Sequence, residues 1–167
     1  MPLIQLFLDI CLFRKGPQDI PASRFLLGLI LGLNLLVSTG LLLMEADVLQ
    51  ALFQAATAMG LMFAFLYLVL GLARLTPRLL QTATAALGSD TVFTLAALPL
   101  MATGQLQPEW QGALSLLLSA LMLWAIAVLA HVLREALNLP YLAGFGLALA
   151  YTAGSLRIMM MWFPSLT

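Results

Sequence analysis

Charged residues are distributed so that five long stretches of this chain are almost free of charge. Only seven basic and seven acidic side chains occur among its 167 residues. A helix crosses the roughly 30 Å of membrane hydrocarbon in about 20 residues, and charged groups are rare at that depth. The five stretches are residues 25–44, 48–73, 79–102, 110–133 and 141–163. We therefore predict an all-α membrane protein, a bundle of five transmembrane helices joined by short loops.

The composition argues against the soluble classes of protein. Hydrophobic residues make up 63% of the chain and charged residues 8%, whereas soluble domains have about 45–50% and about 25%. A domain of this size cannot hide so much apolar surface from water, so a soluble enzyme and a disordered chain are excluded. The net charge of zero gives no attraction for nucleic acid. The expected surroundings are a lipid bilayer.

The third stretch, residues 79–102, is the weakest candidate span. Six polar residues interrupt it: Thr82, Thr84, Ser89, Asp90, Thr91 and Thr94. A four-helix alternative without this span would place Arg134 on the opposite side from the other basic residues. Pro99 is compatible with a span, since neighbouring helices can satisfy the carbonyl group that it frees. We therefore predict that the third stretch does span.

The basic residues predict how the bundle is oriented. Six of the seven lie before the first span or in alternate loops: Arg14, Lys15, Arg24, Arg74, Arg78 and Arg134. The intervening loops carry Glu45, Asp47 and Glu109 and no basic residue. Because positive loops stay in the cytoplasm, we expect a cytoplasmic N-terminus and a periplasmic C-terminus. The Leu-rich and Lys-poor chain fits a bacterial inner membrane.

Residues 1–23 form a separate N-terminal segment before the transmembrane domain of residues 24–167. Their first half is mostly apolar, with Gln5 and Asp9 on one face of a helix. This pattern predicts a short amphipathic helix in the inner membrane interface, too short to cross. Gly and Pro residues then predict a turn, and Ser23 is placed to cap the first span.

Small residues recur four positions apart in three of the predicted spans. They are Gly28 and Gly32 in the first, Ala56, Gly60 and Ala64 in the second, and Gly146, Ala150 and Gly154 in the fifth. Such stripes let helix backbones approach closely in lipid. They indicate either contact with a membrane-protein partner or a second copy, or packing within the bundle itself.

Two charged residues lie deep inside predicted spans, where charge is costly and usually functional. Counted from the inner helix ends, Asp90 is about 17 Å deep and Arg157 about 24 Å deep. We predict that the two form an ion pair, with Ser89 and Thr91 helping to solvate the carboxylate. The alternative is that Arg157 extends to the outer interface while hydroxyl and backbone groups hold Asp90.

Residues with catalytic or metal-binding chemistry are scarce. One histidine, His131, and one cysteine, Cys11, exclude the usual zinc sites, and no phosphate-binding loop or hydrolase motif occurs. His131, Arg134 and Glu135 share a helix face, which we interpret as a membrane-boundary cluster, although a Ser/His pair using His131 remains open. We expect no enzyme activity, cofactor or metal.

A resemblance to known families rests on two segments. Residues Ala96-Ala97-Leu98-Pro99-Leu100, near the end of a polar-flecked third span, resemble a step in the Yip-type five-spanning membrane proteins. Residues 12–23, LFRKGPQDIPAS, are similar to a signature of small proteobacterial inner-membrane proteins. The resemblance implies five spans after an N-terminal interface region, and it transfers no catalytic residue.

The expected function is that of a non-enzymatic membrane protein that organises or binds other membrane components. Its small-residue faces and its N-terminal segment would make the contacts. The alternative is a small transporter or channel component, in which Asp90, with Ser89 and Thr91, lines a polar site at the membrane midplane.

Overall fold

A computed structural model describes residues 3–163 of the chain as helices joined by short loops. Its elements are α1 (Leu3–Cys11), η1 (Pro17–Asp19), α2 (Arg24–Leu42), α3 (Val48–Leu72), η2 (Thr76–Arg78), α4 (Leu79–Leu106), η3 (Pro108–Trp110), α5 (Gln111–Leu137) and α6 (Tyr141–Trp162). The five helices α2 to α6 are long and apolar enough to cross a membrane. The structure thus confirms five candidate spans preceded by one short helix.

Helix α4 confirms the third predicted span. With η2 it forms an apolar helical stretch of 31 residues, and Pro99 lies inside it. Helices α4 and α5 continue to Leu106 and Leu137, beyond the predicted limits of 102 and 133. The prediction ended each span where polarity rises, but polar residues such as Gln105 do not end a helix.

Short polar side chains set where two of the spans begin. The Ser23 hydroxyl accepts a hydrogen bond from the Leu26 backbone N–H at 3.3 Å, which confirms the predicted cap. An Asp47 carboxylate oxygen accepts a hydrogen bond from the Gln50 backbone N–H at 2.9 Å. Each cap satisfies one of the backbone donors that the first turn of a helix leaves unpaired.

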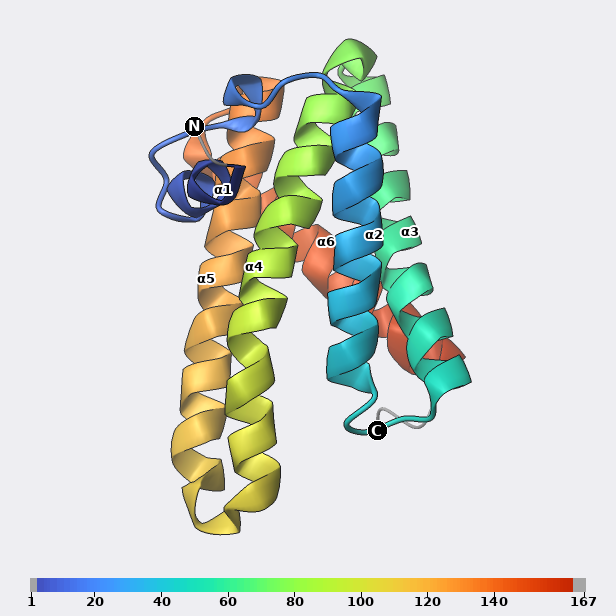
Figure 1. The fold of residues 1–167 in the computed structure, drawn as a ribbon. Helices are drawn as coiled ribbons and strands as arrows, with labels where there is room; N and C mark the ends of the chain where they lie inside the picture. Colours follow the sequence, from blue (N-terminus) through green and yellow to red (C-terminus); the bar gives the residue numbers. More distant parts are fainter. Residues whose placement is uncertain (1–2, 164–167) are drawn as a thin grey trace.

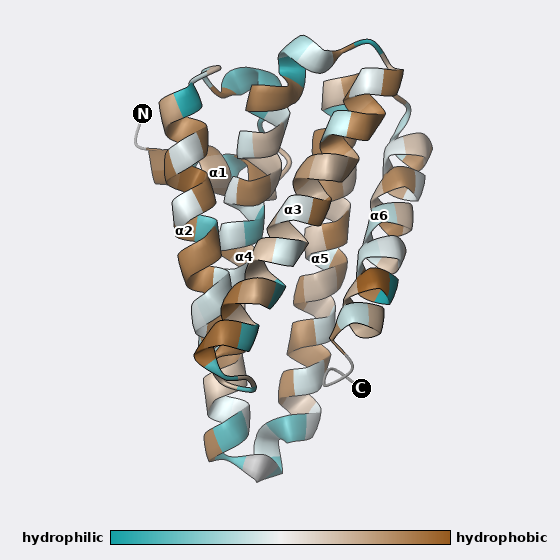
Figure 2. Ribbon diagram, turned by 90° about the vertical axis from the view of Figure 1, so that its right-hand side faces the viewer, coloured by the Kyte–Doolittle hydropathy of each residue, from teal (hydrophilic) through white to brown (hydrophobic). Residues whose placement is uncertain are grey.

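The five long helices run alternately up and down the bundle (Figure 1). The α4–α5 hairpin extends well beyond the α2–α3 turn, and α6 crosses behind the other helices. Figure 2 shows that hydrophilic residues gather mainly at the two ends of the bundle. We call the end where α2, α4 and α6 begin the basic end, because Arg24, Arg74, Arg78 and Arg134 lie there.

Helix α1 lies against the flank of the bundle, where it packs on α4 and α5 (Figure 1). Its buried residues are Leu6, Phe7, Ile10 and Cys11. The Phe7 ring covers Gly88 of α4 so closely that a Cβ atom there would clash with the ring. The Trp124 indole N–H of α5 donates to the Cys11 carbonyl oxygen at 2.9 Å. The predicted short helix is therefore present, and these contacts show that it also packs on the bundle at defined positions.

Candidate functional site

Asp90 is hydrogen bonded to a residue that the sequence analysis did not single out, Asn34 of α2. The Asn34 side-chain nitrogen lies 2.9 Å from an Asp90 carboxylate oxygen and 3.1 Å from the Thr91 hydroxyl. The same nitrogen lies 3.3 Å from the Leu87 carbonyl oxygen. An amide nitrogen has two hydrogens, so three acceptors share them. Asn34 is only 3% exposed, and it therefore joins α2 to α4 in the middle of the bundle.

The predicted pairing of Asp90 with Arg157 does not form in the structure. Arg157 is exposed on α6, and the ion pairs found among residues 3–163 are Lys15 with Asp9 at 3.2 Å and Arg134 with Glu135 at 2.8 Å. The physical reason is the position of α6. This helix packs on α5 near the basic end, and Arg157 lies in its exposed second half.

The hydroxyl groups near Asp90 hydrogen bond to their own helix. Ser89 donates to the Ala85 carbonyl oxygen at 2.8 Å, and Thr91 donates to the Leu87 carbonyl oxygen at 2.7 Å. This i to i−4 pattern is common for Ser and Thr in helices. Ser89 and Thr91 therefore do not solvate the Asp90 carboxylate directly, and Asn34 is its donor.

A cavity of about 110 Å³ lies beside this carboxylate, between four helices. Asn34, Ser38, Ala55, Ala58, Met59, Met62, Leu87, Asp90 and Tyr151 line it. A water molecule occupies about 30 Å³, so the cavity has room for a few waters or one small solute. It combines a carboxylate with amide and hydroxyl groups between the helices.

Two further residues have buried side-chain polar atoms without a hydrogen-bond partner in the part of the chain that is described. Gln54 of α3 is 1% exposed, and neither its side-chain oxygen nor its nitrogen has a hydrogen bond. The Thr39 hydroxyl of α2 is also unpaired. Unsatisfied buried polar groups are uncommon in native proteins and call for an explanation. Gln54 precedes Ala55, which lines the cavity.

All eight small residues of the predicted stripes are exposed: Gly28, Gly32, Ala56, Gly60, Ala64, Gly146, Ala150 and Gly154. At the five glycines among them, no atom lies within 4 Å of the position where a Cβ would be. The stripes therefore do not pack inside the bundle. The glycines that lie most closely against other helices are Gly88, under Phe7, and Gly144, beside the Ala130 carbonyl oxygen of α5.

Two of these stripes border one apolar groove of about 310 Å³ between α3 and α6. Leu61, Ala64, Phe65 and Leu68 of α3 form one wall, and Ala150, Tyr151, Gly154, Ser155 and Ile158 of α6 form the other. The buried residues of α6 are Gly144 and Ala148, both in its first half. The second half of α6 thus forms its wall of the groove without burying any residue in the bundle.

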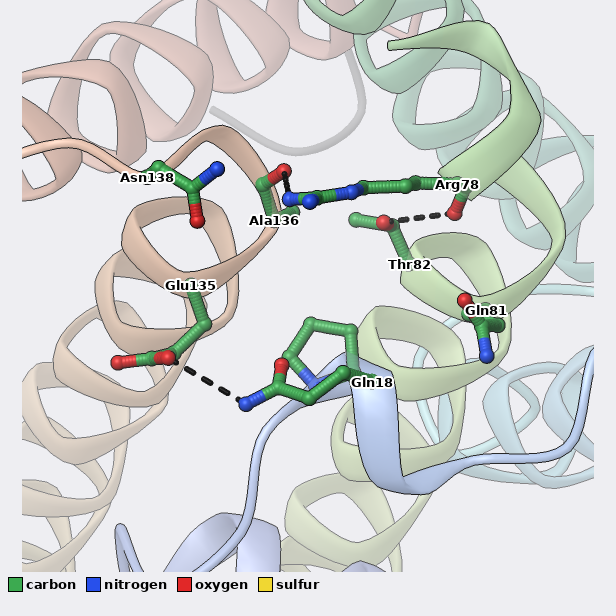
Figure 3. A pocket seen from close by; sticks show the side chains of 8 residues that line it. Gln18, Arg78, Gln81, Thr82, Glu135, Ala136 and Asn138 are labelled. Atoms are coloured by element: carbon green, nitrogen blue, oxygen red, sulfur yellow. Dashed lines mark hydrogen bonds between the residues drawn. The ribbon is translucent and has the colours of Figure 1, made fainter.

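A third hollow lies at the basic end, where three segments far apart in sequence meet (Figure 3). Its volume is about 270 Å³, and it is lined by Pro17, Gln18, Arg78, Gln81, Thr82, Glu135, Ala136 and Asn138. From the sequence alone, Arg78 is expected only to set the topology. No sequence signal places it near Glu135, because η1, α4 and α5 meet only in the folded chain.

Comparison with known proteins yields no match, since no family model, curated protein or solved structure matches this chain.

Proposed function

We propose that this protein is a non-enzymatic inner-membrane component that binds a transmembrane helix of another membrane protein in the α3–α6 groove. The observation that carries the proposal is that Ala64 on one wall and Ala150 and Gly154 on the other line the same groove. In lipid, helices associate where small residues let backbones approach closely. Small residues on both walls therefore favour an inserted helix.

The exposure of α6 supports the same proposal. Its buried residues, Gly144 and Ala148, lie at its beginning, and the exposed stripe Gly146, Ala150 and Gly154 follows the rest of the helix. A helix from a partner would cover this stripe and the wall of the groove that α3 forms. The Yip-type resemblance is in keeping with such a membrane-organising role.

The orientation that we propose follows from charge. The basic end carries Arg24, Arg74, Arg78 and Arg134, and positive loops remain in the cytoplasm. The loops at the opposite end carry Glu45, Asp47 and Glu109. We therefore place the basic end and the N-terminus in the cytoplasm, and the C-terminus in the periplasm, of a bacterial inner membrane.

Gly154→Ile is expected to weaken partner binding strongly without disturbing the bundle. No atom lies within 4 Å of a Cβ at Gly154, so the free chain accommodates the larger side chain. An inserted helix would meet it, and overpacking costs about 1–3 kcal/mol, which reduces association by about fivefold to about 150-fold. The measurement is the amount of partner, or of a second tagged copy, recovered by purification from native membranes.

Gly40→Ile on α2 is the matched control. Gly40 also has no atom within 4 Å of a Cβ, and it lies outside the residues that line the groove. Both variants must insert and purify at the level of the unmodified chain. Equal recovery of partner by the Gly154 and Gly40 variants would contradict the proposal.

A second function, transport of a small solute, is supported by the cavity beside Asp90. Its lining by Asn34, Ser38 and Tyr151 beside Asp90 suits a solute that can donate and accept hydrogen bonds. Polar groups at the midplane between helices are typical of transport sites.

Asp90→Asn separates the two functions. If the chain transports a solute, this nearly isosteric change is expected to abolish a solute-dependent phenotype while the protein remains inserted at normal abundance. Partner recovery through the α3–α6 groove is expected to remain unchanged. Intact solute dependence in Asp90→Asn would reject the transport function and leave the groove proposal unaffected.

A further inference from the structure

The hollow at the basic end has a surplus of hydrogen-bond donors. The Arg78 guanidinium uses one nitrogen, Nη1, to donate to the Ala136 carbonyl oxygen at 2.8 Å, and a guanidinium has five N–H groups. Gln81 uses its amide nitrogen once, toward the Ile20 carbonyl oxygen at 2.7 Å. The Asn138 side chain makes no hydrogen bond within residues 3–163 and faces the same hollow (Figure 3).

Glu135, the acidic residue that lines the hollow, already has partners for both of its carboxylate oxygens. One Glu135 carboxylate oxygen is paired with Arg134 at 2.8 Å, and the other accepts a hydrogen bond from the Gln18 amide at 3.4 Å. Arg134 therefore offsets the charge of Glu135, and the guanidinium of Arg78 supplies the net positive charge of the hollow. A ligand with anionic oxygens would suit this arrangement.

The backbone holds these donors in place. Asn138 ends α5 in the left-handed conformation, with a φ of 54°, and the Arg78 bond to Ala136 ties the start of α4 to the end of α5. The segment containing Gln18 closes a third side, and Gln81 binds that segment through Ile20. Hydrogen bonds between the three segments therefore fix the shape of the hollow.

We propose that this hollow binds a phosphate group. The planar fork of an arginine matches phosphate oxygens, and charge-assisted hydrogen bonds to amide and guanidinium donors hold them. The volume of about 270 Å³ accommodates a phosphate group with ordered water, because one water occupies about 30 Å³. The source of the phosphate is either a phospholipid headgroup or a soluble phosphate ester.

The position of the hollow brings it within reach of both sources. It lies at the basic end, where Arg74, Arg78 and Arg134 end the apolar part of the spans, which is the level of lipid phosphates. The same end opens to the aqueous phase beyond the helices. The hollow shares no lining residue with the α3–α6 groove, so this proposal is independent of the proposed function.

The test compares binding of two probes to the purified full-length protein. Delipidated protein in mild detergent is titrated with inorganic phosphate, followed by phosphorus NMR, and with phosphatidylglycerol, followed by native mass spectrometry. We expect Arg78→Gln to weaken binding by about tenfold or more, because a hydrogen bond to a charged group contributes about 1.5–3 kcal/mol. Arg74→Gln, which removes an exposed arginine from the same end, is the matched control and should remain within about twofold.

A second variant guards against a folding defect in Arg78→Gln. Asn138→Gly keeps the left-handed backbone, which glycine adopts readily, and removes only the amide. It should weaken binding by a few-fold. Binding of phosphatidylglycerol alone assigns the hollow to lipid, and binding of inorganic phosphate assigns it to soluble ligands. Binding of neither probe, or equal binding by the Asn138, Arg78 and Arg74 variants, would overturn the proposal.

Discussion

Gly144→Ala is expected to lower the free energy of unfolding by about 1–3 kcal/mol, the usual cost of overpacking a close contact. A Cβ at Gly144 would lie 2.7 Å from the Ala130 carbonyl oxygen and 3.0 Å from the Arg134 Cβ. A backbone oxygen cannot move aside without displacing α5. Because the buried residues of α6 are Gly144 and Ala148, the clash falls where α6 joins the bundle. Unfolding by titration with a denaturing detergent measures the loss.

Gly146→Ala on the same helix is the control for this prediction. No atom lies within 4 Å of a Cβ at Gly146, and alanine favours a helix over glycine by up to about 1 kcal/mol. We therefore expect its free energy of unfolding to stay equal or to rise slightly. If both variants unfold alike, the close packing of α6 on α5 is incorrect.

The second large effect concerns Cys11 and the docking of α1. Burial raises the pKa of the Cys11 thiol from its ordinary value of 9.0 to about 11, and the residue is 5% exposed. The thiolate is the reactive form, so at neutral pH Cys11 has about 100-fold less of it than an ordinary thiol. Labelling by a maleimide should be slow and should rise about tenfold per pH unit until the pH nears the raised pKa.

Gly88→Ala is expected to accelerate this labelling at pH 7.5 by up to about 100-fold. A Cβ there would clash with the Phe7 ring, so the ring and α1 must move away from α4. Exposure then restores the ordinary pKa of the thiol. Gly104→Ala, where the nearest atom to a Cβ is Leu114 Cδ1 at 3.5 Å, should label like the unmodified chain. Slow labelling of folded Gly88→Ala would contradict the docking of α1.

The architecture could be predicted from the sequence because charge is excluded from lipid. That single constraint marks each span, and it placed the start of α3 at Val48 and of α6 at Tyr141. Ser23 was identified as a cap because its side chain acts on its own helix. Such local and one-dimensional signals do not depend on how the helices pack.

The site could not be predicted because its contacts join separate helices. Asn34 and Asp90 are 56 positions apart. The rotation of α2 that brings them together cannot be read from the sequence of either helix. The same holds for Gly144, whose neighbour on α5 is Ala130. Spacing identified the stripe of Gly146, Ala150 and Gly154, but spacing alone does not tell an outward face from an inward one.

Photo-crosslinking in native membranes tests most directly whether a transmembrane helix occupies the α3–α6 groove. Leu68 lines the groove and is 59% exposed, whereas Leu123 on α5 lies outside it and is 68% exposed. A photoreactive residue at Leu68 should form a discrete protein adduct that disappears in Gly154→Ile, and the same residue at Leu123 should form lipid adducts. Lipid adducts alone at both positions would contradict the proposal that a transmembrane helix fills the α3–α6 groove.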